Sequence, residues 1–132
     1  MAALIVDTGV LVDVERGKRQ LDDVIADDDD VAIAAITLAE LEVGVRLAST
    51  KSQLAKRRLF IDSILSAASV IRYDEPTALR HADLLAHVRQ MGRPRGAHDL
   101  IVAATAAATG RTLVTTDSRA FTDLPDISVS VL

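Results

Sequence analysis

Four acidic residues stand where predicted strands give way to helices or turns. Asp7 directly follows a short apolar run at the start of the chain, and Asp117 follows a second strand-like run near its end. Glu40 and Asp99 each fall in the first turn of a predicted helix. Ligands of an open parallel sheet bind outside the carboxyl ends of its strands. If these strands are neighbours, all four carboxylates meet in one cleft.

Four carboxylates in one cleft repel one another, so the arrangement requires a positive occupant. The chain has no cysteine, and its three histidines do not cluster. Oxygen ligands favour a hard divalent cation, Mg²⁺ in the first place and Mn²⁺ as the alternative. The four acids therefore predict a magnesium site.

Each acid also has a structural explanation. Asp7 could simply cap the helix that follows it. Glu40 and Asp99 could complement the dipoles of the helices that they begin. Asp117 could be an ordinary turn residue. The metal-site hypothesis depends on all four residues falling at the same edge of the sheet.

Three further residues compete for places in such a cleft. Glu42 points about 200° away from Glu40 around the same helix, so only one of the two can face the cleft. We expect Asp13 on the outer face of its helix, with a supporting role as the alternative. His98 is either a ligand or, as is commoner, a surface or partly buried histidine.

The elements that must position these acids alternate between strand and helix. Predicted strands cover residues 3–6, 31–36, 69–73, 112–116 and 127–131, and predicted helices cover residues 8–16, 19–26, 37–48, 51–68, 75–91 and 97–109. The strands are short apolar runs, which is typical of strands covered on both faces. We therefore predict an α/β fold, a three-layer sandwich with a mostly parallel central sheet of about five strands.

Length and composition fit one domain that spans residues 1–132 and buries its core without disulfides. Hydrophobic residues make up 49% of the chain but aromatic residues only 2%, so the core must be aliphatic. We see neither a signal peptide nor a membrane span and expect a cytoplasmic protein. The net charge of −4 argues against a general nucleic-acid-binding surface, although Arg89, Arg93 and Arg95 form a local basic cluster.

Four segments in this order resemble the PIN-domain ribonucleases, in particular the VapC toxins of bacterial type II toxin–antitoxin pairs. They are LIVDTGVLVD (residues 4–13), ITLAELEVGV (36–45), GRPRGAHDLIVAATAAATG (92–110) and TLVTTDSRAF (112–121). The resemblance implies a Mg²⁺-dependent endoribonuclease that cleaves structured RNA, such as tRNA or ribosomal RNA, by metal-activated water. It implies catalytic and metal-binding roles for Asp7, Glu40, Asp99 and Asp117.

The chain departs from the family pattern at two positions. Many relatives carry another acid three residues after the position of Asp117, where this chain has Ala120, so a second ion would bind more weakly or not at all. Relatives often place an aliphatic residue before Gly96, where this chain has Arg95. Because Arg93 and Arg95 precede the helix of Asp99, we expect both to contact RNA phosphates, and the alternative is that they belong to an ordinary solvated loop.

Threonines beside the acids could orient the carboxylates by hydrogen bonds. We predict this role for Thr8 and Thr116, and we consider Thr37 and Thr115 as further candidates. Helix capping or strand packing is the alternative role for these threonines, and we expect Thr37 to cap the helix predicted at 37–48.

The resemblance also implies two protein partners, a second copy of the chain and an antitoxin. An antitoxin helix would lie in a groove along the helices at 8–26 and 37–68, and a basic antitoxin side chain would block the acids. The candidate groove residues are Val10, Leu11, Val14, Leu38, Leu41, Val45, Leu54, Phe60 and Ile61.

Two other functions remain open at this point. A phosphatase or phosphoacceptor could use Asp7 as its nucleophile, but Gly9 stands where haloacid-dehalogenase-type sites need a second aspartate. A receiver-type site needs a lysine after a late strand, and the last lysine in the chain is Lys56. The other alternative is a metal-binding interaction module with weak or lost catalysis.

Overall fold

The computed structural model describes residues 1–132, which form five strands, six α-helices and one 3₁₀ turn. The strands are β1 (Ala3–Val6), β2 (Asp30–Ala34), β3 (Ser69–Ile71), β4 (Thr112–Thr115) and β5 (Ser128–Val131). The helices are α1 (Thr8–Glu15), α2 (Ala35–Arg46), α3 (Lys51–Ala67), α4 (Glu75–Met91), α5 (Ala97–Thr109) and α6 (Ser118–Phe121), and the 3₁₀ turn is Leu21–Asp23.

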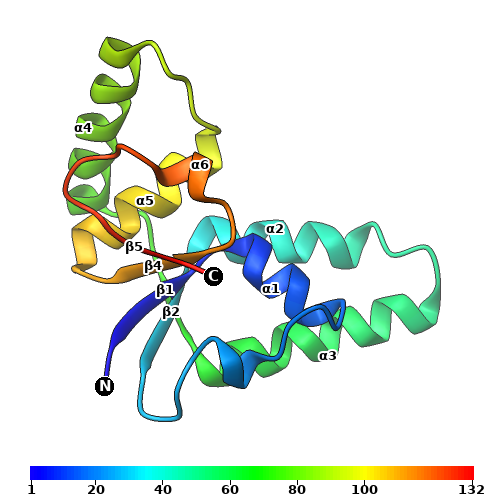
Figure 1. The fold of residues 1–132 in the computed structure, drawn as a ribbon. Helices are drawn as coiled ribbons and strands as arrows, with labels where there is room; N and C mark the ends of the chain where they lie inside the picture. The colour runs from blue at the N-terminus through cyan, green and yellow to red at the C-terminus, as the bar shows by residue number, and fades with distance from the viewer.

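The strands form one sheet in the order β3-β2-β1-β4-β5, and every neighbouring pair is parallel. Helices α4, α5 and α6 lie on one side of the sheet and α1, α2 and α3 on the other (Figure 1). The predicted α/β sandwich with a parallel central sheet is confirmed. The α2–α3 hairpin extends away from the sheet (Figure 1).

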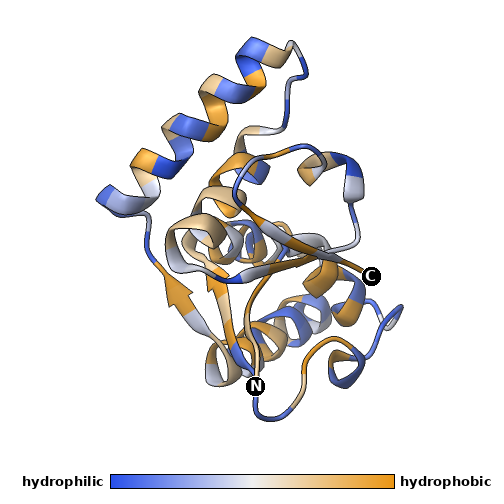
Figure 2. Ribbon diagram, turned by 60° about the vertical axis from the view of Figure 1, so that its left-hand side comes forward, coloured by the Kyte–Doolittle hydropathy of each residue, from blue (hydrophilic) through white to orange (hydrophobic).

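Each face of the sheet packs its own aliphatic core. Successive side chains of a strand point to opposite faces, so Ile5 joins the core under α4 and α5 while Val6 joins the core under α1, α2 and α3. Figure 2 shows hydrophobic colours concentrated in the strands, whereas the peripheral helix α4 alternates between hydrophilic and hydrophobic residues. None of the helices is both long and apolar enough to cross a bilayer.

The strand order places the switch point of the sheet at β1. The chain builds outward from β1 through β2 to β3, then returns to add β4 on the other side of β1. Connections therefore leave the carboxyl ends of β1 and β4 in opposite directions, which opens a crevice between them. Val6 pairs with Val114 in this register, so Asp7 emerges next to Thr115.

The opposite edge of the sheet is closed by one arginine. The Arg111 side chain is 13% exposed and donates to the carbonyl oxygens of Leu4 (3.2 Å) and Asp30 (2.9 Å). It also pairs with the Asp30 carboxylate at 3.1 Å. A largely buried guanidinium thus joins the amino-terminal ends of β1, β2 and β4, while the acids gather at their carboxyl-terminal ends.

Some predicted boundaries are wrong. The helix predicted at 19–26 is only the 3₁₀ turn Leu21–Asp23, because the Asp29 carboxylate accepts hydrogen bonds from the Ala26 and Ala2 backbone N–H groups and closes a turn there. Strand β2 ends at Ala34 rather than 36, and β3 ends at Ile71 rather than 73. Helix α2 therefore begins before Thr37, whose predicted role as a cap is wrong.

Candidate functional site

Asp7 is the buried acid of the site, and hydrogen bonds hold its carboxylate in place. Its side chain is buried, and its backbone N–H donates to the Val114 carbonyl at 2.9 Å, which extends the pairing of β1 with β4. One carboxylate oxygen accepts from the Thr8 backbone N–H and the other from the Thr115 hydroxyl, both at 2.9 Å. Asp7 therefore does cap α1, as the structural explanation proposed, and the same bonds hold its carboxylate at the crevice.

Thr115 connects two of the acids. Its hydroxyl donates to Asp7 and accepts the backbone N–H of Asp117 at 3.0 Å. The structure gives this orienting role to Thr115 and not to Thr116, which makes no hydrogen bond to any of the four carboxylates. The reason is register, because side chains alternate along a strand and pairing with β1 turns Thr115 toward Asp7.

Glu40 is held by a polar group from α1. The Thr8 hydroxyl donates to Glu40 Oε1 at 2.9 Å and lies 3.1 Å from the hydroxyl of Thr37, which is fully buried. His98 Nδ1 lies 3.6 Å from Glu40 Oε2, with both side chains partly exposed. The predicted contact between Thr8 and an acid is present, and His98 belongs to the rim of the site.

Asp99 lies in the first turn of α5, against the backbone of its own helix start. A methyl group at Gly96, the residue that caps α5, would stand only 2.9 Å from Asp99 Oδ2. Gly96 therefore makes room for this carboxylate, a role that the sequence reasoning did not assign. The position of Gly96, three residues before Asp99, could have indicated this role.

Asp117 is exposed and caps the short helix α6. One of its oxygens accepts the backbone N–H groups of Arg119 (3.1 Å) and Ala120 (3.2 Å). Asp117 is therefore a turn and capping residue, as its structural explanation stated. The capping bonds use only Oδ1 and leave Oδ2 without a protein donor.

The carboxylates influence one another electrostatically. Burial raises the pKa of Asp7, hydrogen bonds from Thr115 and Thr8 oppose this effect, and the charges of Glu40 and Asp117 add to it. Burial also raises the pKa of Asp99. The negative charges of Asp7, Asp117 and Glu40 raise that pKa further, and only His98 acts in the other direction. The expected convergence of the four acids at one sheet edge is therefore observed, and it carries electrostatic repulsion.

The donor set fits a hard divalent cation. All four acids offer carboxylate oxygens, and Glu40, Asp99 and Asp117 are partly exposed, so their side chains can turn. No three of the acids or histidines converge closely enough to hold an ion in their present rotamers. Ion binding would therefore draw the more exposed carboxylates toward the fixed Asp7.

The competing acid Glu42 is engaged elsewhere. It faces away from the crevice and pairs with Arg46 and Arg58, each at 2.6 Å. Glu40 is therefore the acid of α2 that lies at the crevice.

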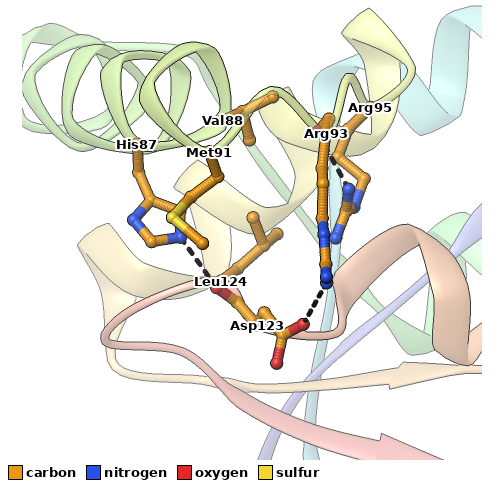
Figure 3. A pocket seen from close by; sticks show the side chains of 7 residues that line it. All are labelled: His87, Val88, Met91, Arg93, Arg95, Asp123 and Leu124. Carbon is orange, nitrogen blue, oxygen red and sulfur yellow. Dashed lines mark hydrogen bonds and ion pairs between the residues drawn. The ribbon is translucent and has the colours of Figure 1, made fainter.

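The two predicted RNA-binding arginines differ in their surroundings. Arg93 is 63% exposed and pairs with Asp123 at 3.1 Å. Arg95 is half-buried and donates to two backbone carbonyls, those of Arg93 (2.9 Å) and Thr122 (2.8 Å). Figure 3 shows the two side chains next to each other above Asp123.

Comparison with known proteins identifies relatives over nearly the whole chain. Residues 4–127 match the model of the PIN domain. Ribonuclease VapC5 of Mycobacterium tuberculosis is 36% identical over 116 residues, which are 88% of this chain and 84% of the relative. The tRNA(fMet)-specific endonuclease VapC of Shigella flexneri is 33% identical over 69% of this chain and 67% of its own length.

A solved structure supports the same relationship. The crystal structure of VapBC-5 from Mycobacterium tuberculosis, a member of the VapBC family of toxin–antitoxin systems, contains a chain that superposes with a TM-score of 0.82. That chain is 30% identical, and the match covers 100% of both chains. The shared fold thus extends from one end of the chain to the other.

Replacing Asp99 by Asn should stabilise the metal-free protein, because it removes one of four mutually repelling charges. The raised pKa means that ionised Asp99 destabilises the fold at neutral pH, and this penalty disappears as pH falls through the raised pKa. Urea unfolding in EDTA should therefore show a gain for Asp99→Asn at pH 7 that shrinks in acid. Added Mg²⁺ should raise the Tm of the parent more than that of the variant. A variant less stable than the parent in EDTA would contradict this account.

Replacing Gly96 by Ala should displace the Asp99 carboxylate without unfolding the protein. The φ angle at Gly96 is −58°, which alanine adopts freely, so the free energy of unfolding should change by less than about 1 kcal/mol. RNA cleavage should fall roughly 10- to 100-fold, since displacement by about 1 Å can have this effect. Gly44→Ala is the matched control, because nothing lies within 4 Å of its added methyl group. Equal cleavage by the two variants would remove Gly96 from the site.

Proposed function

The chain belongs to the PIN-domain family and is a VapC-type ribonuclease toxin, and from this premise we propose that it is a Mg²⁺-dependent endoribonuclease of structured RNA. We assign the reaction to the crevice between β1 and β4. The observation that carries the proposal is the meeting of four carboxylates at the switch point of the sheet, where the charges of Glu40 and Asp117 help to raise the pKa values of Asp7 and Asp99.

Each of the four acids has a different part in the proposed site. A bound divalent cation would activate the attacking water and neutralise charge that develops on the phosphate. Asp7 would provide an anchored ligand, since Thr8 and Thr115 already orient both of its oxygens. Glu40, Asp99 and Asp117 would complete the site, with Mn²⁺ as an alternative to Mg²⁺.

Ala120 stands where the family pattern has a further acid, and this affects the number of metal ions that the site can hold. Ala120 is 8% exposed and packs in the core under α4 and α5, so it contributes no ligand. We propose that the site uses one principal ion, and that Asp117 Oδ2 is the only further oxygen on this side of the crevice.

Structured RNA is the proposed substrate class. The relative from Shigella flexneri is named as a tRNA(fMet)-specific endonuclease, which makes tRNA the first substrate to test. Arg93 is exposed at the loop before α5 and would meet a phosphate near the scissile bond after releasing the surface ion pair with Asp123. Such a pair contributes only about 0–1 kcal/mol, so the exchange costs little.

An antitoxin and a second copy of the chain are the proposed protein partners. Much of the groove predicted from sequence is core, because Val10, Leu11, Leu41, Val45 and Ile61 are buried. Leu54, also predicted to line the groove, is 47% exposed. Three further apolar side chains of the α2–α3 hairpin are exposed as well, namely Val43 (51%), Leu47 (74%) and Leu59 (70%).

We expect an antitoxin helix to cover this hairpin. Because α2 runs between Glu40 and the exposed leucines, an antitoxin bound to the leucines could place a basic side chain against the acids. Replacing Leu47 and Leu59 together by Ser should abolish co-purification with an antitoxin expressed from the neighbouring gene. Leu79→Ser, equally exposed (63%) on α4, should leave the complex intact. If the double variant still co-purified with the antitoxin in full yield, the antitoxin would have to bind a different surface.

A digest of purified tRNA tests the catalytic proposal directly. The protein should cut at few positions with Mg²⁺, and EDTA should stop cleavage until excess Mg²⁺ restores it. Asp7→Asn should lower the rate by at least roughly 10²-fold, the usual effect of losing one preorganised electrostatic group. Asp62→Asn, an exposed acid on α3, serves as the control. Cleavage that persists in EDTA would rule out metal dependence, and intact cleavage by Asp7→Asn would remove the acid site.

A further inference from the structure

Three basic side chains tie α4 and the loop after it to the chain that follows α6, and Figure 3 shows the contacts of His87 and Arg93 with Asp123. His87 Nε2 donates to the Asp123 carbonyl at 2.9 Å, and Arg93 pairs with the Asp123 carboxylate. Arg95 Nη2 donates to the Thr122 carbonyl at 2.8 Å. We refer to His87, Arg93 and Arg95 as the basic clasp.

Arg95 is the member of the clasp most tightly bound to the fold. Both of its Nη groups donate to backbone carbonyls, while its Nε is buried and has no hydrogen-bond partner. Its side chain lines a cavity of about 250 Å³ together with Val88 and Leu100, which belong to the core. Two of the five guanidinium N–H groups make these bonds and hold the side chain against the fold, whereas the side chain of Arg93 is 63% exposed.

The position of this contact relates it to the acids. Arg95 precedes Asp99 by four residues, and Thr122 follows Asp117 by five. The hydrogen bond between Arg95 and Thr122 therefore joins the start of α5 to the end of α6, whose first turn Asp117 caps. The two carboxylates repel each other across this junction.

We propose that Arg95 is a positioning residue of the acid crevice, which holds the helix starts of Asp99 and Asp117 together through the Thr122 carbonyl and does not contact RNA. This inference rests on the proposed metal-dependent cleavage. It assigns different roles to two neighbouring arginines, since Arg93 remains free to contact phosphate.

The clasp suits this task for a chemical reason. A planar guanidinium can donate to two carbonyls at once with little loss of geometry, whereas a lysine ammonium is a point donor on a flexible stem. The acceptors are neutral carbonyls, so salt does not screen the contact as it screens an ion pair. Asp123 adopts a left-handed backbone conformation (φ 64°), which turns its carbonyl toward His87.

The test compares Arg95→Ala with Arg93→Ala in three measurements. These are kcat and KM for tRNA cleavage in Mg²⁺, the Kd for tRNA in EDTA with its salt dependence, and the rise in Tm on adding Mg²⁺ alone. For Arg95→Ala we expect kcat to fall roughly 10- to 100-fold with KM and Kd unchanged, since misplaced groups lose rate rather than binding. The Mg²⁺-induced rise in Tm should also shrink. Arg93→Ala should keep kcat, weaken RNA binding and lower the salt slope by about one.

Two further variants distinguish misplaced acids from a simple loss of folding. Arg95→Lys, which can still reach one carbonyl, should recover part of kcat and of the Mg²⁺ response. Asp123→Asn removes only the negative charge that pairs with Arg93 and tolerates the left-handed backbone, so its kcat should equal that of the parent.

Several outcomes would overturn the inference. Arg95→Ala with parental kcat and Mg²⁺ response would show that the clasp does not position the acids. A weaker Kd and a lower salt slope for the same variant would make Arg95 an RNA contact. If Arg95→Ala lowered the Tm but the folded fraction kept the parental kcat, Arg95 would be a purely structural residue. Failure of the parent to cleave RNA or to respond to Mg²⁺ would instead refute the proposed function.

Discussion

Repulsion among four carboxylates around the end of β1 is the constraint on which the rest of this structure depends. Burial and mutual charge raise the pKa values of Asp7 and Asp99, so the fold holds these groups together against an electrostatic cost. Hydrogen bonds from neutral groups offset part of that cost, through the hydroxyls of Thr8 and Thr115 and the backbone N–H of Thr8. A cation that enters the crevice would remove the remainder, which links metal binding to stability.

The two edges of the sheet differ in how charge is paired. At the amino-terminal edge, the largely buried Arg111 meets two carbonyls and neutralises the Asp30 carboxylate. At the carboxyl-terminal edge, acids gather without a lysine or arginine in contact with any of their carboxylates, and the nearest basic group is His98. A protein could neutralise these acids internally with a nearby arginine, but such a partner would compete with a metal ion for the same oxygens.

The basic residues of the α4–α5 loop extend this division. They lie close in sequence to Asp99, yet Arg95 binds backbone carbonyls and Arg93 binds Asp123 rather than any of the four acids. Neither arginine contacts the four carboxylates, and in the proposed role Arg95 holds the start of α5 against the end of α6. Gly96 contributes from the same loop by leaving space for the Asp99 carboxylate.

The sequence by itself determined the α/β alternation, the two-faced aliphatic strands and the identity of four acids at element ends, because these features depend on local apolar runs and on residue type. It also identified Thr8 as a partner of an acid. Only the tertiary structure decided that Thr115 rather than Thr116 orients Asp7, since this choice depends on the register between strands whose residues are 108 positions apart. It likewise decided that Thr37 is buried within α2 rather than a cap, and that Arg95 is engaged with Thr122. Such pairings arise from packing between distant segments, and no local propensity encodes them.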